Sequence, residues 1–99
     1  MVKYMLFYKG PATPPGASHA GWMDWFSKLG DALVDQGSPI VPIGTVMHVD
    51  GSTTESAARL NGYSVISANT RNDALELIKD HPYLRLGSDY TIEVFERER

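Results

Sequence analysis

The sequence predicts an α+β fold, with its elements in the order β-α-β-(β)-β-α-β. Strand-like alternation of apolar residues marks both ends of the chain, a helical period runs through residues 18–36, and a second strand–helix–strand run occupies residues 62–96. This order is that of the split βαβ, or ferredoxin-like, plan, and the pattern leaves room for an extra hairpin in the middle. With 99 residues, of which 42% are hydrophobic, the chain is predicted to form a single domain, residues 1–99.

The first strand is predicted over residues 1–9. Tyr4, Leu6 and Tyr8 alternate with a second set of apolar residues, so both faces of this strand are expected to be covered. The three prolines and two glycines of residues 10–16 exclude a regular element there. This segment is therefore predicted to be a loop.

A first helix is predicted over residues 18–36, with Ser18 as its N-cap and Gly37 as its C-terminal stop. Its charged residues gather on one side, and its apolar residues form a stripe on the other. The stripe holds Trp22, Met23, Phe26, Leu29 and Leu33, together with His19. A histidine inside an apolar stripe either satisfies a hydrogen bond in the core or lines a cavity.

The middle of the chain is less regular. Residues 38–49 are extended by composition, and their two prolines place this stretch at a sheet edge or in a kink. Asp50-Gly51 is a turn dipeptide. Residues 52–59 are polar without a clear period, and we interpret them as a loop or a short irregular hairpin.

The second half of the chain repeats the strand–helix–strand pattern. Residues 62–69 alternate as a strand. A capping box that begins at Thr70 opens a helix, which ends near Asp80 because Pro82 disfavours the helical conformation in the residue before it. Residues 89–96 alternate again and are predicted to form the last strand.

Composition and charge exclude several classes of protein. The chain has no cysteine, which rules out disulfides, thiolate metal sites and a cysteine nucleophile, and fits a reducing cytoplasm as its location. Its net charge is −3 without a basic cluster, so nucleic acid is not an expected partner. The apolar run near the amino terminus is too short for a signal peptide or a membrane span, and no phosphate loop, dinucleotide motif or serine-hydrolase motif is present. We therefore expect neither a membrane partner nor a cofactor.

The predicted sheet needs a partner on one of its faces. Two helices cover one face of a four-stranded sheet, while the first strand carries apolar or aromatic residues on both of its faces. We therefore expect a homodimer in which two sheets pack face to face, with a ligand cleft between the helices and the sheet of each subunit.

Several short motifs are spread along nearly the whole chain. They are the strand Met1–Tyr8, His19 at the start of the first helix, Gln36-Gly37, Ile43-Gly44, Asn61-Gly62-Tyr63, Asp73-Ala74-Leu75, His81-Pro82-Tyr83 and Glu93-Val94. Together they resemble the YCII-related family of small dimeric α/β-barrel proteins. The resemblance implies a ferredoxin-like protomer, a dimer, and an active-site cleft that contains a histidine with an aspartate nearby.

In this resemblance, His19 matches the histidine of the family. Many members have Asp-Pro-Tyr where this chain has His81-Pro82-Tyr83, so either His81 or the preceding Asp80 is the expected partner of His19. One branch of the family resembles a dehydrochlorinase that acts on a chlorinated hydroxyhydroquinone, and the wider fold hosts muconolactone isomerase-like enzymes. The resemblance thus implies lyase or isomerase chemistry on small rings, by an analogy at the level of fold.

The candidate catalytic residues are His19, His81 and Asp80. His19 is predicted to transfer protons, since imidazole titrates near neutral pH. The helix dipole favours a positive imidazolium for His81 at the end of the second helix, and the alternative is a solvent-exposed loop histidine. Two histidines and Asp80 have no recognised metal-ligand spacing, so no metal is expected.

The candidate substrate-binding residues are Trp22, Phe26, Tyr63 and Tyr83, as cleft walls and as hydroxyls that orient a phenolic or carbonyl group. For each of them ordinary core packing is the alternative. The predicted function is a cofactor-independent lyase or isomerase that acts on a small cyclic or aromatic oxygenated metabolite. The alternatives are a non-catalytic dimer that binds a small molecule or assists a larger enzyme, and a purely structural dimer.

Overall fold

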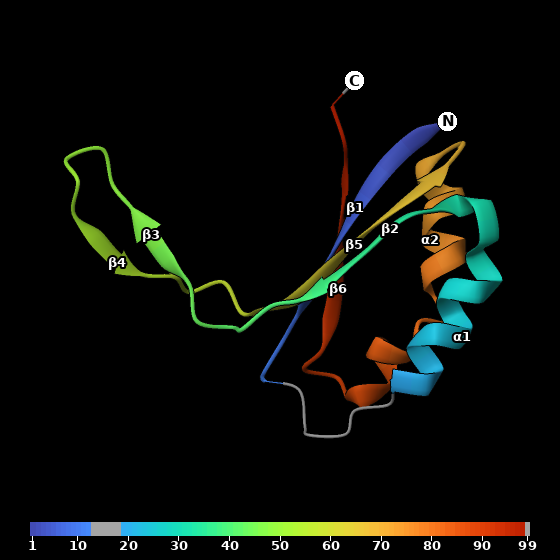
Figure 1. Cartoon of the computed structure of the whole chain (residues 1–99), viewed down its shortest axis with the longest axis horizontal. Helices are drawn as coiled ribbons and strands as arrows, with labels where there is room; N and C mark the ends of the chain where they lie inside the picture. The colour runs from blue at the N-terminus through green and yellow to red at the C-terminus, as the bar shows by residue number, and fades with distance from the viewer. Residues whose placement is uncertain (13–18, 99) are drawn as a thin grey trace.

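The computed structural model of the protein describes residues 1–12 and 19–98, without the side chains of residues 19 and 20. Four strands form one sheet in the order β2-β5-β1-β6, and every neighbouring pair is antiparallel. These strands are β1 (Val2–Lys9), β2 (Leu33–Pro39), β5 (Leu60–Ala68) and β6 (Thr91–Glu96). The helices α1 (His19–Leu29) and α2 (Arg71–Ile78) lie together on one side of this sheet (Figure 1).

The order of the elements agrees with an α+β chain of the ferredoxin-like kind. The two strand–helix–strand units, β1-α1-β2 and β5-α2-β6, are joined by an extra hairpin, which the sequence leaves room for. The hairpin consists of β3 (Thr45–Met47) and β4 (Thr53–Glu55), which form a separate two-stranded sheet. The predicted turn at Asp50-Gly51 connects them, and Gly51 has the positive φ of 87° that this turn uses.

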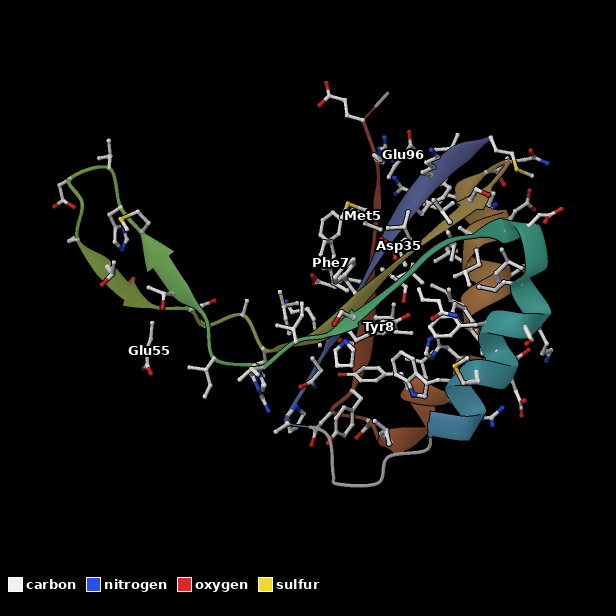
Figure 2. All side chains as sticks on the ribbon, viewed as in Figure 1. Met5, Phe7, Tyr8, Asp35, Glu55 and Glu96 are labelled. Atoms are coloured by element: carbon white, nitrogen blue, oxygen red, sulfur yellow. The ribbon has the colours of Figure 1, made fainter. Side chains whose placement is uncertain are left out.

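The two faces of β1 have different surroundings. Tyr4, Leu6 and Tyr8 are buried under the helices, as their alternation predicts. Met5 and Phe7 point to the opposite side of the sheet from Tyr8 (Figure 2). The core therefore lies between the sheet and the helices. Its buried apolar members are Val2, Tyr4, Leu6, Tyr8, Trp25, Phe26, Leu29, Ile66, Ala68, Ala74, Ile78 and Tyr83.

The first helix is shorter than the sequence predicts. The helical period extends to residue 36, but α1 ends at Leu29, because Gly30 takes a left-handed backbone with a φ of 54° and the chain turns through the 3-10 helix η1 (Gly30–Ala32). Leu33 then pairs with Ile66 as part of the edge strand β2. Leu33 fits both a helical and a strand-like period, and its pairing with β5 decides between them.

This shift also moves the neighbouring elements. The strand predicted over residues 38–49 is replaced by β2, which ends at Pro39, and by the short strand β3. Ser18, the predicted N-cap of the first helix, lies outside the described residues. The cap of α2 is confirmed, since the Thr70 hydroxyl oxygen accepts the backbone N–H of Asp73 at 3.1 Å. After α2, the chain forms a further 3-10 helix, η2 (Pro82–Leu86), which the sequence analysis does not predict.

Candidate functional site

A cavity of about 240 Å³ opens between α1 and the sheet, at the end where β2 leaves β5. None of the described residues that line it is an aspartate, a glutamate, a lysine, an arginine or a histidine. The lining residues are Tyr8, Trp22, Met23, Phe26, Gln36, Gly37, Ser38, Pro39, Asn61, Gly62, Tyr63, Tyr83 and Leu86. The cavity is therefore mainly apolar and uncharged, with five aromatic residues among the thirteen described lining residues and with hydroxyl and amide groups as its polar elements.

Aromatic rings in edge-to-face contact form the wall of the cavity. The Trp22 ring lies 4.8 Å from that of Tyr8 and 6.2 Å from that of Phe26, measured between centroids. The ring of Tyr83 lies 5.2 Å from that of Tyr8. Aromatic side chains have few rotatable bonds, and each of these rings is held by a neighbouring ring. The wall is consequently rigid.

A directional chain of hydrogen bonds runs through this wall. The backbone N–H of Tyr83 donates to His81 Nδ1 at 2.9 Å, so the proton of a neutral His81 resides on Nε2. His81 Nε2 lies 3.1 Å from Tyr8 Oη and donates to it. The Tyr8 hydroxyl donates to Ser64 Oγ at 2.7 Å, and the Ser64 hydroxyl donates to the carbonyl of Gln36 at 2.8 Å. In this series of hydrogen bonds, the partner of each group determines whether that group acts as a donor or as an acceptor.

His81 is a buried, neutral member of this chain. It is fully buried, and the rings of Trp22 and Trp25 lie 4.6 and 4.1 Å from its own. Burial lowers the pKa of His81 to about 3. The sequence instead favours an imidazolium or an exposed loop histidine at this position. The difference arises because η2 folds back under α1, where desolvation of the imidazole outweighs the helix dipole.

Asn61 and Tyr83 form a second polar pair at the cavity. Asn61 Nδ2 donates to Tyr83 Oη at 2.9 Å and to the carbonyl of Pro11 at 2.8 Å. The Tyr83 side chain is fully buried, and its hydroxyl accepts the hydrogen bond from Asn61. Burial also raises the pKa of Tyr83, which keeps the phenol protonated. The pair therefore fixes the position of the Tyr83 ring in the wall of the cavity.

The structure brings some of the predicted site residues together and separates others. Trp22, Phe26, Tyr63 and Tyr83 all line the cavity, whereas His81 lies behind its wall. Asp80 is exposed and lines a shallow depression on another part of the surface, beside Asp24, Lys28 and Arg85. Residue 19 begins α1, but the imidazole of His19 lies outside the described part of the chain.

Sequence reasoning missed Asn61 and the role of Ser64. Asn61 appears in the sequence only as part of the motif Asn61-Gly62-Tyr63, and Ser64 belongs to no motif. Their functions depend on partners that are distant along the chain, such as Tyr83 for Asn61 and Tyr8 for Ser64. Residues 1–12 and 19–98 contain neither a cluster of three or more potential metal ligands nor a helix with the length and apolarity needed to cross a bilayer.

No protein-family model matches the chain, and no curated protein matches it. Among solved structures, the chain is similar to 5-chloro-2-hydroxyhydroquinone dehydrochlorinase from Burkholderia phenoliruptrix, in its complex with 2,5-dihydroxybenzoquinone. The TM-score is 0.55 and the sequence identity 12%, over 92% of this chain and 90% of that chain. At this identity the similarity shows a shared fold, and the conclusion from the comparison is that this α+β chain has the architecture of that dehydrochlorinase.

Proposed function

We propose that the protein is a homodimeric lyase or isomerase that acts, without a cofactor, on a small aromatic or cyclic oxygenated molecule. The observation that carries this proposal is the uncharged, mainly apolar cavity with packed aromatic rings in its wall. A cavity of about 150 Å³ accommodates benzene, so the cavity of about 240 Å³ in this protein suits one substituted ring. Trp22 and Phe26 would contact the ring, and the Gln36 amide would bind one of its oxygens.

His19 is the proton-transfer residue in this proposal. Trp22, Met23 and Phe26 line the cavity, and they follow position 19 by three, four and seven residues, which is the spacing of one helix face. In an elimination, His19 would accept a proton from a hydroxyl group or from an sp³ ring carbon. The electron pair of that bond would form a new double bond while the leaving group departs with the electron pair of its own bond. In an isomerisation, the same proton would return to another ring atom. Neither reaction requires an oxidant or a reductant.

His81 is a positioning residue in this proposal. It is neutral and already hydrogen-bonded at both ring nitrogens, so it holds Tyr8 and the start of η2 in place. We assign no step to Asp80, which is exposed and does not line the cavity. Of the three candidate catalytic residues, this proposal therefore assigns the proton transfer to His19 alone.

The homodimer is proposed to form through the open face of the sheet. Phe7 and Phe95 lie on this face with their ring centroids 5.7 Å apart, and Phe95 is 53% exposed. Met5 lies on the same side of β1 as Phe7 (Figure 2). An exposed aromatic cluster on a sheet is typical of a surface that a partner covers. A second copy would cover it symmetrically, since isologous dimers are the commonest oligomers.

A non-catalytic small-molecule-binding dimer is the second candidate function. It is favoured by the absence of a charged side chain or a histidine among the described residues that line the cavity. Such a cavity binds a ring well but supplies little acid–base chemistry by itself. The two candidates thus share the ligand and differ in what position 19 contributes.

The test uses binding and turnover on the same protein. 2,5-Dihydroxybenzoquinone is titrated by calorimetry, and chlorinated hydroxyhydroquinones and muconolactones are screened for chloride release or isomerisation. We expect the probe to bind, and Trp22→Leu to weaken binding by roughly three- to tenfold through loss of the contact between the two rings. Exposed His48 provides a matched control, since His48→Ala should leave binding unchanged.

Turnover then separates the two candidate functions. If the protein is an enzyme, we expect the His19→Ala variant still to bind the probe. Its turnover rate should fall by at least about a hundredfold, which is the usual contribution of a general acid–base group. An unchanged rate in that variant would remove His19 from the mechanism. Binding without turnover of any compound by the unmodified protein would favour the binding dimer. Failure of the probe and of every screened compound to bind would reject both functions.

A further inference from the structure

The hairpin arm, which we define as residues 40–59, projects away from the body of the molecule. It leaves the sheet where β2 ends and returns where β5 begins, and Figure 1 shows it extending on the side away from the helices. Its two strands have three residues each, and their substantial contacts are with each other. Isolated two-stranded hairpins are at best marginally stable in water. This arm therefore lacks the packing that normally holds such a hairpin.

Apolar side chains are concentrated on one limb of the arm. Six of the ten residues in the outgoing limb, 40–49, are aliphatic, whereas the returning limb, 50–59, is mostly polar. Val41, Ile43 and Met47 are 72%, 78% and 70% exposed, and Val49 is fully exposed. Glu55 marks the polar limb in Figure 2. A concentration of exposed aliphatic residues on a projecting segment is typical of a surface that is buried in an assembly.

The same molecule also offers the surface that would receive this limb. The open face of the sheet carries Phe7, Phe95 and Met5, and both strands that lead into the arm, β2 and β5, belong to that sheet. A two-fold axis over the open face would pair the sheets and at the same time bring the arm of each subunit onto the other. Because the contact is isologous, both arms would be buried at once.

We propose that the apolar limb of the arm, residues 40–49, packs on a second copy of this chain and forms part of the dimer interface. This inference rests on the homodimer in the proposed function. It adds that the arm, and not the sheet face alone, holds the two subunits together. The occupant is a second copy, because the arm extends on the side of the sheet where Met5 and Phe7 lie (Figure 2), so a copy that covers this face also meets the arm.

The experiment is sedimentation velocity over a concentration series with two pairs of charge-matched variants. Val41→Lys with Met47→Lys places two cations on the apolar limb. Ala57→Lys with Leu75→Lys adds the same charge on exposed residues of the polar limb and of α2. We expect the first pair to raise the dimer dissociation constant by more than about tenfold, as the charging of a buried interface should, and the second pair to change it by less than about threefold.

A label provides the direct readout of contact. Because the chain has no cysteine, Met47→Cys gives one attachment site for a nitroxide. Chains that carry the nitroxide are mixed with ¹⁵N-labelled chains that carry no nitroxide. The proposal expects the nitroxide to broaden amide signals in the body of the ¹⁵N-labelled partner.

The outcomes distinguish the arm from the rest of the proposed function. If the dimer dissociation constant is the same in both variant pairs and no signal is broadened across subunits, the arm contact is overturned. The dimer through the sheet face would then remain. A protein that stays monomeric at every concentration would overturn both the arm contact and the dimer, while ring binding in the cavity would remain measurable by calorimetry. Recovery of a different protein on the arm in place of a second copy would also overturn the proposal.

Discussion

At the scale of single residues, Tyr8 joins the core to the cavity. Its side chain is buried, its ring lines the cavity, and its hydroxyl both accepts from His81 and donates to Ser64. Burial raises the pKa of Tyr8, so it remains a neutral phenol. The alternation of β1 predicts that Tyr8 is inside. It does not predict the two hydrogen bonds, because their partners come from residues that are more than fifty positions away.

Tyr8→Phe is expected to destabilise the protein by about 1–3 kcal/mol, because it leaves the His81 Nε2–H and a lone pair of Ser64 Oγ unpaired in the core. The free energy of unfolding is measured by urea denaturation. Tyr90→Phe is the matched control, since the Tyr90 hydroxyl makes one long, exposed hydrogen bond of 3.4 Å to Ala12. Equal losses in the two variants would contradict a structural role for the buried chain.

The stability of the protein should fall as pH decreases through the range in which His81 titrates in the unfolded chain. The pKa of His81 is about 3 in the folded protein against an ordinary value of 6.5, so the unfolded state binds the extra proton first. Between pH 6.5 and 3, each decrease of one pH unit should lower the free energy of unfolding by up to about 1.4 kcal/mol.

Two measurements check this dependence on pH. Denaturation at a series of pH values gives the slope, and ¹⁵N chemical shifts give the tautomer of His81. We expect a neutral ring with its proton on Nε2 from pH 5 to 8. A ring that becomes doubly protonated in the folded protein near pH 6 would show that the imidazole is solvated and outside the hydrogen-bond chain.

At the scale of elements, the strand β2 depends on a close approach between backbones. Gly37 has a φ of 73°, and a Cβ atom there would lie 1.7 Å from the carbonyl oxygen of Tyr63. This glycine lets β2 bulge against β5 where both strands border the cavity. The sequence motif Gln36-Gly37 therefore belongs to a strand, although the helical period predicts that Gly37 ends a helix.

Gly37→Ala is expected to destabilise the protein by about 2–4 kcal/mol, because the new Cβ would force the two strands apart. Gly30→Ala is the matched control: Gly30 also has a positive φ, but nothing lies within 4 Å of an added Cβ. Its expected cost is about 1 kcal/mol, from backbone conformation alone. Thermal and urea unfolding of both variants would settle the comparison, and similar losses would argue against the close contact at Gly37.

The boundary between α1 and β2 shows why some elements cannot be predicted from local pattern. Apolar residues continue with helical spacing past Leu29, so the sequence predicts one long helix. Gly30 offers a stop, but a glycine inside a helical pattern is also compatible with continuation. The choice is made by pairing of Leu33 and its neighbours with β5, which is far along the chain.

At the scale of the whole molecule, the open face of the sheet predicts assembly. Phe95→Lys should shift the protein from dimer to monomer, because it places a charge in the centre of the proposed interface. Leu75→Lys on α2 is the matched control, since it changes an exposed apolar residue on the opposite layer. Light scattering coupled to size-exclusion chromatography measures the molar mass. A dimer that persists in Phe95→Lys would place the interface elsewhere.

The sequence by itself determined the order of the elements, the turn at Asp50-Gly51, the cap at Thr70 and the buried face of β1. Each of these depends on residues within a few positions of one another, so local periodicity and capping chemistry specify them.

Only the tertiary structure decided where α1 ends, that His81 is buried and neutral, and that Asn61 and Ser64 belong to the site. These properties arise from contacts between distant segments: η2 under α1, and β5 between β1 and β2. Desolvation and hydrogen-bond direction depend on the three-dimensional surroundings of a group, and no local pattern in the sequence encodes them.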